Sequence, residues 1–126
     1  MASSPNEDKI RRLQQIVLRS KRIFLQDAVE RTVKLQGEIS EWSRGLLPAD
    51  SLGESVYRYA HALKGMALTV GCKDIHRYSE QADSYSIHHK GEWTEERIAE
   101  LLKLAELLAE QVRRDLEQLE GAAGTS

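Results

Sequence analysis

Apolar residues in this chain recur at spacings of three and four almost throughout, which is the period of a helix that buries one face. Few runs show the strict alternation of apolar and polar residues that is typical of a half-buried strand. Only two prolines occur, Pro5 and Pro48, and both lie at predicted element boundaries, where proline is tolerated. The chain is therefore predicted to be all-α.

Turn and capping residues divide the chain into helices. A first helical stretch is expected over residues 7–43, with the polar run at residues 19–22 as a break between a short leading helix and a longer one. Further helices are expected over residues 52–70, over residues 73–89 and after Thr94. Because the connections are short, neighbouring helices should be antiparallel. The predicted fold is an up-down-up-down four-helix bundle with an additional short N-terminal helix or helical extension.

Individual residues mark the ends of the predicted helices. Ser51 followed by Glu54 matches a capping box at the start of the second long helix. Gly71 predicts the end of that helix, because glycine tolerates the left-handed conformation of a C-terminal cap. Thr94 is the expected N-cap of the last helix. The buried stripe of the second helix is expected to consist of Val56, Ala60, Leu63, Ala67 and Val70.

A length of 126 residues favours a single domain. Residues 1–8 are expected to be a flexible N-terminus, residues 9–120 the helical bundle, and residues 121–126 a flexible tail or the start of a linker. The sole cysteine, Cys72, excludes an internal disulfide and is expected to be a packing residue.

Charge and hydropathy argue against several classes of partner. The formal net charge is −2, so no basic excess indicates nucleic acid. No apolar run approaches the roughly 18 residues needed to cross a bilayer, so direct membrane insertion is not expected. The N-terminus lacks the basic and apolar segments of a signal peptide. A cytoplasmic location is the resulting expectation.

The most informative chemistry surrounds His61, in the second predicted helix. Gly65 stands in the interior of that helix, where glycine costs about 1 kcal/mol relative to alanine. Lys64 and Gly65 follow His61 by three and four residues, so all three share one helical face. A nucleophile, a cation and a missing side chain together suggest a surface that another macromolecule approaches closely. Alternatively, Gly65 allows two helices of the bundle to pack closely, and the spacing alone leaves both interpretations open.

The pentapeptide that begins at His61 reads His-Ala-Leu-Lys-Gly, and Gly71 stands ten residues after His61. This pattern resembles the histidine-containing phosphotransfer (HPt) domain, whose motif is histidine, any residue, leucine, lysine and glycine, with a further glycine at that distance. The four-helix bundle of that family would cover the chain from about residue 20 to residue 119. Met66 departs from the family, which often has a small hydroxyl residue at this position.

The resemblance implies specific roles. His61 would accept a phosphoryl group on Nε2 from a receiver-domain aspartate, and a neutral imidazole has the lone pair that this step needs. Lys64 would stabilise the phosphoryl oxygens, and Gly65 would leave room for the receiver. Asp83, 22 residues after His61, falls where the family has a polar residue that orients the imidazole through Nδ1, although many members have the longer glutamate or glutamine. The implied partner-binding residues are Tyr57, Arg58, Lys64, Gly65 and Leu68.

The implied partners are receiver (response regulator) domains and, where the chain is part of a larger parent, a histidine kinase or other signalling domain. The function implied is that of a carrier in a two-component phosphorelay, which takes the phosphoryl group from one receiver and passes it to another. No nucleotide-binding motif is visible, so autonomous ATP-dependent kinase activity is not expected. No cofactor is expected to bind stably, and Mg²⁺ is expected on the receiver.

Two other functions are open at this point. A non-phosphorylated interaction or regulatory module of a larger signalling protein would keep the bundle but bury His61 or the face at Gly65. A metal-binding bundle would require His76, His88 and His89 to converge, although their spacing matches no compact ligand set, and no metal ligand is assigned.

Overall fold

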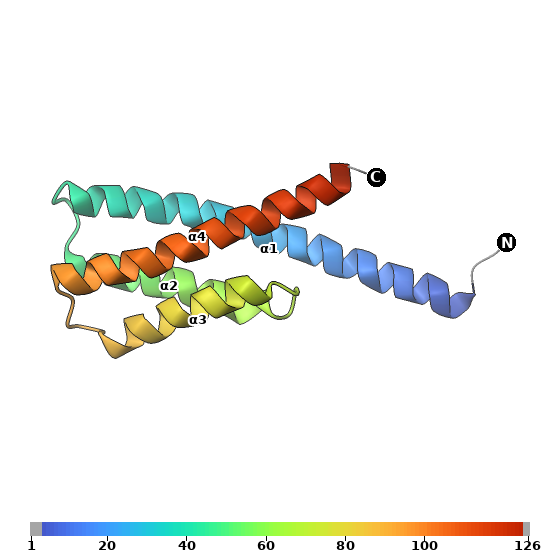
Figure 1. Ribbon diagram of the computed structural model, residues 1–126, viewed down its shortest axis with the longest axis horizontal. Coiled ribbons are helices and arrows are strands. Elements are labelled where there is room, and N and C mark those ends of the chain that lie inside the picture. The colour runs from blue at the N-terminus through green and yellow to red at the C-terminus, as the bar shows by residue number, and fades with distance from the viewer. Residues whose placement is uncertain (1–3, 125–126) are drawn as a thin grey trace.

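The computed structural model describes residues 4–124, which form four helices joined by short connections (Figure 1). Successive helices run in opposite directions, so the described chain is an up-down-up-down bundle. This confirms the predicted all-α fold. The helices are α1 (Pro5–Ser43), α2 (Ala49–Ala67), α3 (Lys73–His88) and α4 (Glu95–Gly124).

Helix α1 is one continuous element of 39 residues, and the predicted break at residues 19–22 is wrong. That run contains no glycine or proline, and most of its side chains are exposed, so nothing interrupts the backbone hydrogen bonds. The N-terminal extension is therefore a direct prolongation of the bundle helix. In Figure 1 it projects well beyond the other three helices.

Helix α1 also starts earlier than expected. Ser4 forms a capping box with Glu7, whose backbone N–H donates to Ser4 Oγ at 3.2 Å, and Pro5 occupies the first turn. Residues 5–8 are therefore helical, although the flexible N-terminus was expected to reach residue 8. Residues 1–3 lie outside the described part of the chain.

The capping box predicted at Ser51 is wrong. Helix α2 begins at Ala49, three residues before the expected start, and its N-cap is Pro48, which makes no side-chain capping bond. Pro48 has φ −64° and ψ 152°, an extended conformation that already directs the chain into the first turn. The preceding connection is tight, because Gly45 adopts a positive φ of 76°.

The remaining helix ends follow the sequence more closely. Helix α2 ends at Ala67, three residues before the expected end, and Gly71 has the positive φ of 81° that suits glycine. Thr94 caps α4 as predicted, with its Oγ1 accepting from the backbone N–H of Arg97 at 3.2 Å. Residues 121–124 are the last turn of α4, whereas a flexible tail was expected there, and residues 125–126 lie outside the described chain.

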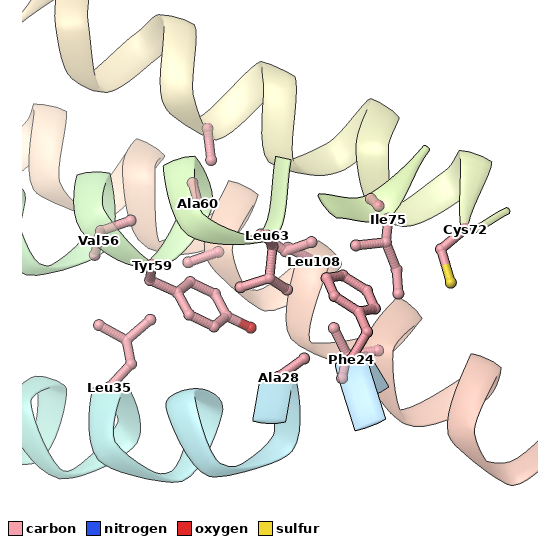
Figure 2. Close-up of a cluster of buried hydrophobic side chains, with 14 of the residues drawn as sticks. Phe24, Ala28, Leu35, Val56, Tyr59, Ala60, Leu63, Cys72, Ile75 and Leu108 are labelled. Atoms are coloured by element: carbon pink, nitrogen blue, oxygen red, sulfur yellow. The ribbon is translucent and has the colours of Figure 1, made fainter. Parts of the chain in front are cut away.

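The core forms where the apolar faces of the helices meet. Figure 2 shows Phe24, Ala28 and Leu35 of α1 facing Tyr59 and Leu63 of α2. The Tyr59 hydroxyl is hydrogen-bonded to Thr32 Oγ1 at 2.7 Å, and burial raises the pKa of Tyr59 above its usual value. Every residue of the predicted α2 stripe is buried, which confirms its orientation: Val56, Ala60, Leu63, Ala67 and Val70.

Close packing depends on a glycine that the sequence did not single out. A Cβ added to Gly53 would overlap the indole of Trp93, so the α2 backbone is in direct contact with this ring. We expect Gly53→Ala to lower the free energy of unfolding by about 1–3 kcal/mol through overpacking, despite alanine's higher helix propensity. Urea denaturation of the wild type and the variant would measure the difference in the free energy of unfolding. An unchanged or raised urea midpoint in the variant would contradict the close contact between Gly53 and Trp93.

Candidate functional site

His61 lies in the middle of α2, on the side of the helix that faces solvent. Its side chain is 63% exposed. The adjacent residue Ala60 is fully buried in the core. Successive residues on a helix point about 100° apart, so the His61 side chain is directed away from the core. The imidazole is therefore held on a rigid helix while its ring remains accessible to a second molecule.

A carboxylate from the neighbouring helix contacts this imidazole. Asp83 of α3 lies with its Oδ1 3.1 Å from His61 Nδ1, and its side chain is only 3% exposed. Asp83 shares the inner face of α3 with Ala82 and Ser86, which explains its burial. Burying a carboxylate costs free energy unless it is hydrogen-bonded, and each of the two oxygens of Asp83 has a hydrogen-bond partner.

Lys64 completes a three-residue group. Its Nζ donates to the other carboxylate oxygen of Asp83, Oδ2, at 3.2 Å, and its side chain is 35% exposed. One buried carboxylate therefore bridges the imidazole and the ammonium, each through its own oxygen. The sequence placed His61 and Lys64 on one face and named Asp83, but it did not reveal this bridge.

The hydrogen bond to Asp83 favours one tautomer of His61. When Nδ1–H donates to the carboxylate, the other ring nitrogen, Nε2, has the free lone pair. A neutral imidazole arranged in this way presents a nucleophilic nitrogen to solvent, and the buried carboxylate fixes the ring's orientation. The arrangement suits covalent attack by Nε2 on an electrophile brought by another molecule.

Tyr57 is a second constraint on the imidazole. Its ring stacks on that of His61 with centroids 5.4 Å apart and an interplanar angle of 27°. Tyr57 precedes His61 by four residues, and this spacing brings helical side chains together. Tyr57 was expected to contact a partner; its stacking on His61 was not foreseen, although the spacing contained the signal.

Gly65 opens the surface beside His61. A Cβ at this position would meet no described atom within 4 Å, apart from its own helical neighbours. Gly65 therefore plays no part in packing one helix of the bundle against another; Gly53 does that. The two other residues expected on this surface are also exposed: Leu68 at 57%, and Arg58, which pairs with Glu54 at 3.5 Å.

The other histidines do not assemble into a metal site within residues 4–124. His88 and His89 lie edge to face with centroids 4.7 Å apart, while His76 approaches Glu80 at 4.0 Å. In this part of the chain there is no group of three or more His, Cys, Asp or Glu side chains arranged to hold a metal ion. The convergence of His76 with the other two histidines is therefore not found.

Cys72 is the N-cap residue of α3 and is only 2% exposed. Burial raises the pKa of its thiol to about 11, which opposes the thiolate form. Cys72 is one of the buried residues of the hydrophobic core, as expected for a side chain that serves packing.

Within residues 4–124, none of the helices is both long enough and apolar enough to cross a bilayer.

Residues 19–122 match the model of the Hpt domain family. Neither the curated proteins nor the solved structures include a significant match to this chain. The family match spans most of the sequence and contains all four helices in whole or in large part, together with His61, Lys64 and Asp83. Members of this family are phosphocarrier modules of phosphorelays that interact with receiver domains, and they are not autonomous kinases. The chain belongs to the Hpt domain family.

Proposed function

We propose that His61 accepts a phosphoryl group from the aspartyl phosphate of one receiver domain and passes it to the aspartate of another. One observation carries this proposal: an exposed imidazole whose Nδ1 is bonded to a buried carboxylate, which leaves Nε2 free. The exposure of His61 and the open face at Gly65 favour this function over a module that relays no phosphate.

In the transfer step, the lone pair of Nε2 attacks the phosphorus of the aspartyl phosphate. A P–N bond forms as the P–O bond breaks, and the electron pair of that bond returns to the receiver carboxylate. The imidazole becomes positively charged as it donates its lone pair, and the Asp83 carboxylate 3.1 Å from Nδ1 stabilises that charge. The reverse step, to a second receiver, follows the same path with the roles of nitrogen and oxygen exchanged.

Lys64 supplies the positive charge for the phosphoryl oxygens. Its ammonium is tied to Asp83 at 3.2 Å, on the same carboxylate that orients His61. A third of its side chain is exposed, so the flexible stem can bring the ammonium toward a phosphoryl group on Nε2. Charge-assisted hydrogen bonds of this kind are about twice as strong as neutral ones.

The proposed docking surface consists of the residues around the imidazole on the exposed face of α2 and of Leu68, the C-cap of that helix. Leu68 contributes apolar area, Arg58 a charge at the rim, and Tyr57 an aromatic ring beside His61. Gly65 leaves the space through which the receiver backbone and its aspartyl phosphate approach.

Gly65→Ala separates the folding role of this glycine from its docking role. Because the added methyl group meets nothing within the described bundle, we expect the free energy of unfolding to rise by up to about 1 kcal/mol. Phosphotransfer from a receiver should nevertheless slow, by roughly tenfold, because the methyl group occupies the docking space. Denaturant unfolding and a transfer time course measure the two effects. An alanine variant that is more stable and fully active would show that this clearance is not needed.

The function itself is tested by transfer between purified proteins. A receiver domain carrying radiolabelled aspartyl phosphate is mixed with this chain, and a second, unlabelled receiver is added afterwards. The proposal predicts that label moves first to this chain and then to the second receiver. If no receiver of a broad panel loses label to the chain, the proposal is wrong.

A further inference from the structure

The N-terminal part of α1 exposes an apolar stripe that the bundle does not use. Ile10, Leu13 and Val17 are about half exposed, and they continue the face on which Phe24 and Ala28 are buried. Ile10, Val17 and Phe24 follow one another at seven-residue steps, which is the repeat of a coiled-coil seam. The open apolar depression at this stripe is lined only by residues of α1 itself: Ile10, Leu13, Gln14, Val17 and Leu18.

A projecting helix of this length is marginally stable in water without packing of its apolar face. We propose that residues 7–23 of α1 pair antiparallel with the same segment of a second copy, forming a two-fold symmetric dimer. In such a dimer each contact between two different residues occurs twice, because the same surface is used by both chains.

The apolar positions are self-complementary in one register. Ile10 and Val17 can occupy the first position of the heptad and Leu13 the fourth. Antiparallel pairing then places Leu13 of each copy opposite Val17 of the other. The same register brings Ile16 opposite Ile16 of the second copy. It thereby covers a side chain that is 60% exposed and lies to one side of the main stripe.

The charges select the antiparallel orientation. Glu7, Gln14 and Lys21 stand at successive seven-residue steps along one edge of the seam. In the antiparallel register Glu7 faces Lys21 of the second copy, and the two Gln14 side chains meet on the symmetry axis. Parallel pairing offers no such match, because it sets this edge against the opposite edge, which carries Lys9 and Ile16.

An anionic membrane is the competing occupant, since Arg12, Arg19 and Arg22 give the opposite face of this segment a basic character. A helix lying on a membrane needs neither a seven-residue register nor opposite charges placed symmetrically about Gln14. Both features favour a second copy.

The interface is small, so the dimer should be weak and dependent on concentration. None of its residues belongs to α2 or α3, which carry His61, Lys64 and Asp83. Dimerisation is therefore independent of the phosphotransfer proposal, and either can fail without the other.

Sedimentation equilibrium over micromolar to millimolar concentrations tests the dimer. The wild-type mass should rise from the monomer value of 14.3 kDa toward twice that value. Leu13→Glu should weaken association by at least about tenfold, because it buries unpaired charges in the seam. The matched control Gln15→Glu, on the opposite face, should leave association unchanged. Neither variant touches the core, and thermal unfolding checks that both remain folded.

A disulfide cross-link tests the register. Ile16→Cys should form a symmetric disulfide under mild oxidation, whereas Gln15→Cys should not. The native Cys72 does not compete, because it is only 2% exposed and burial raises its pKa to about 11. A chain that stays monomeric up to millimolar concentration would overturn the proposal. So would a monomeric chain that binds vesicles of phosphatidylserine and phosphatidylcholine through the same residues.

Discussion

Replacing His61 with glutamine is expected to abolish phosphoryl transfer to this chain, a loss of at least about 1,000-fold. Glutamine has a similar length, but its amide nitrogen is not nucleophilic. The substitution replaces one of the two groups bonded to the buried Asp83 but leaves Lys64 in place, so the free energy of unfolding should change by no more than about 1 kcal/mol. Transfer from a radiolabelled receiver, followed by gel separation, measures the loss.

Three other histidines provide an internal control for this result. His76, His88 and His89 remain in the His61→Gln variant, so residual label on the chain would reveal an accepting residue elsewhere. An unfolding transition like that of the wild type establishes that lost transfer is not lost folding. A folded variant that still takes up phosphate at the wild-type rate would remove His61 from the mechanism.

Replacing Asp83 with alanine is expected to slow transfer by about 10- to 100-fold while leaving the accepting residue in place. The substitution removes the oxygen 3.1 Å from His61 Nδ1, so the imidazole loses its fixed orientation and its preferred tautomer. It also releases Lys64 from its bond at 3.2 Å. Quenched-flow transfer kinetics measure the rate, and ¹⁵N chemical shifts of the His61 ring report the tautomer.

Asp83→Asn is the matched control, because asparagine keeps a carbonyl oxygen that can accept from Nδ1. A positioning role predicts that asparagine restores most of the tautomer preference and part of the rate, with the remaining deficit reflecting the lost charge. A purely structural role predicts instead that both variants lower thermal stability and leave the ring tautomer unchanged. Equal transfer rates in wild type and Asp83→Ala would refute the positioning role.

The bundle was predictable because it depends on periodicity. The stripe predicted for the second helix is buried from Val56 to Ala67, and Val70 is buried just after the end of α2, since spacing determines which face of a helix is apolar. The predicted break near residue 20 was wrong, because polar residues without glycine or proline do not end a helix. The Ser51 cap was wrong because the tight turn at Gly45 and the extended Pro48 start α2 earlier.

The site was only partly predictable. Spacing placed Lys64 and Gly65 on the face of His61, and the short connection predicted that α2 and α3 are antiparallel neighbours. The alignment that brings Asp83 to His61 was indicated only by the family pattern. Spacing places Gly53 three residues before Val56, on the buried stripe, and Gly65 on the face of His61. Local sequence does not show that Gly53 lies directly against Trp93, 40 positions later in the chain, or that Gly65 faces open space.

Locating the phosphoryl group after transfer from a receiver tests the role of His61 most directly. We expect a phosphate that is labile in acid and stable in base, located on His61 by tandem mass spectrometry and on its Nε2 by ³¹P–¹H correlation NMR. Phosphate found on another residue, or bonded to Nδ1 of His61 in place of Nε2, would contradict it.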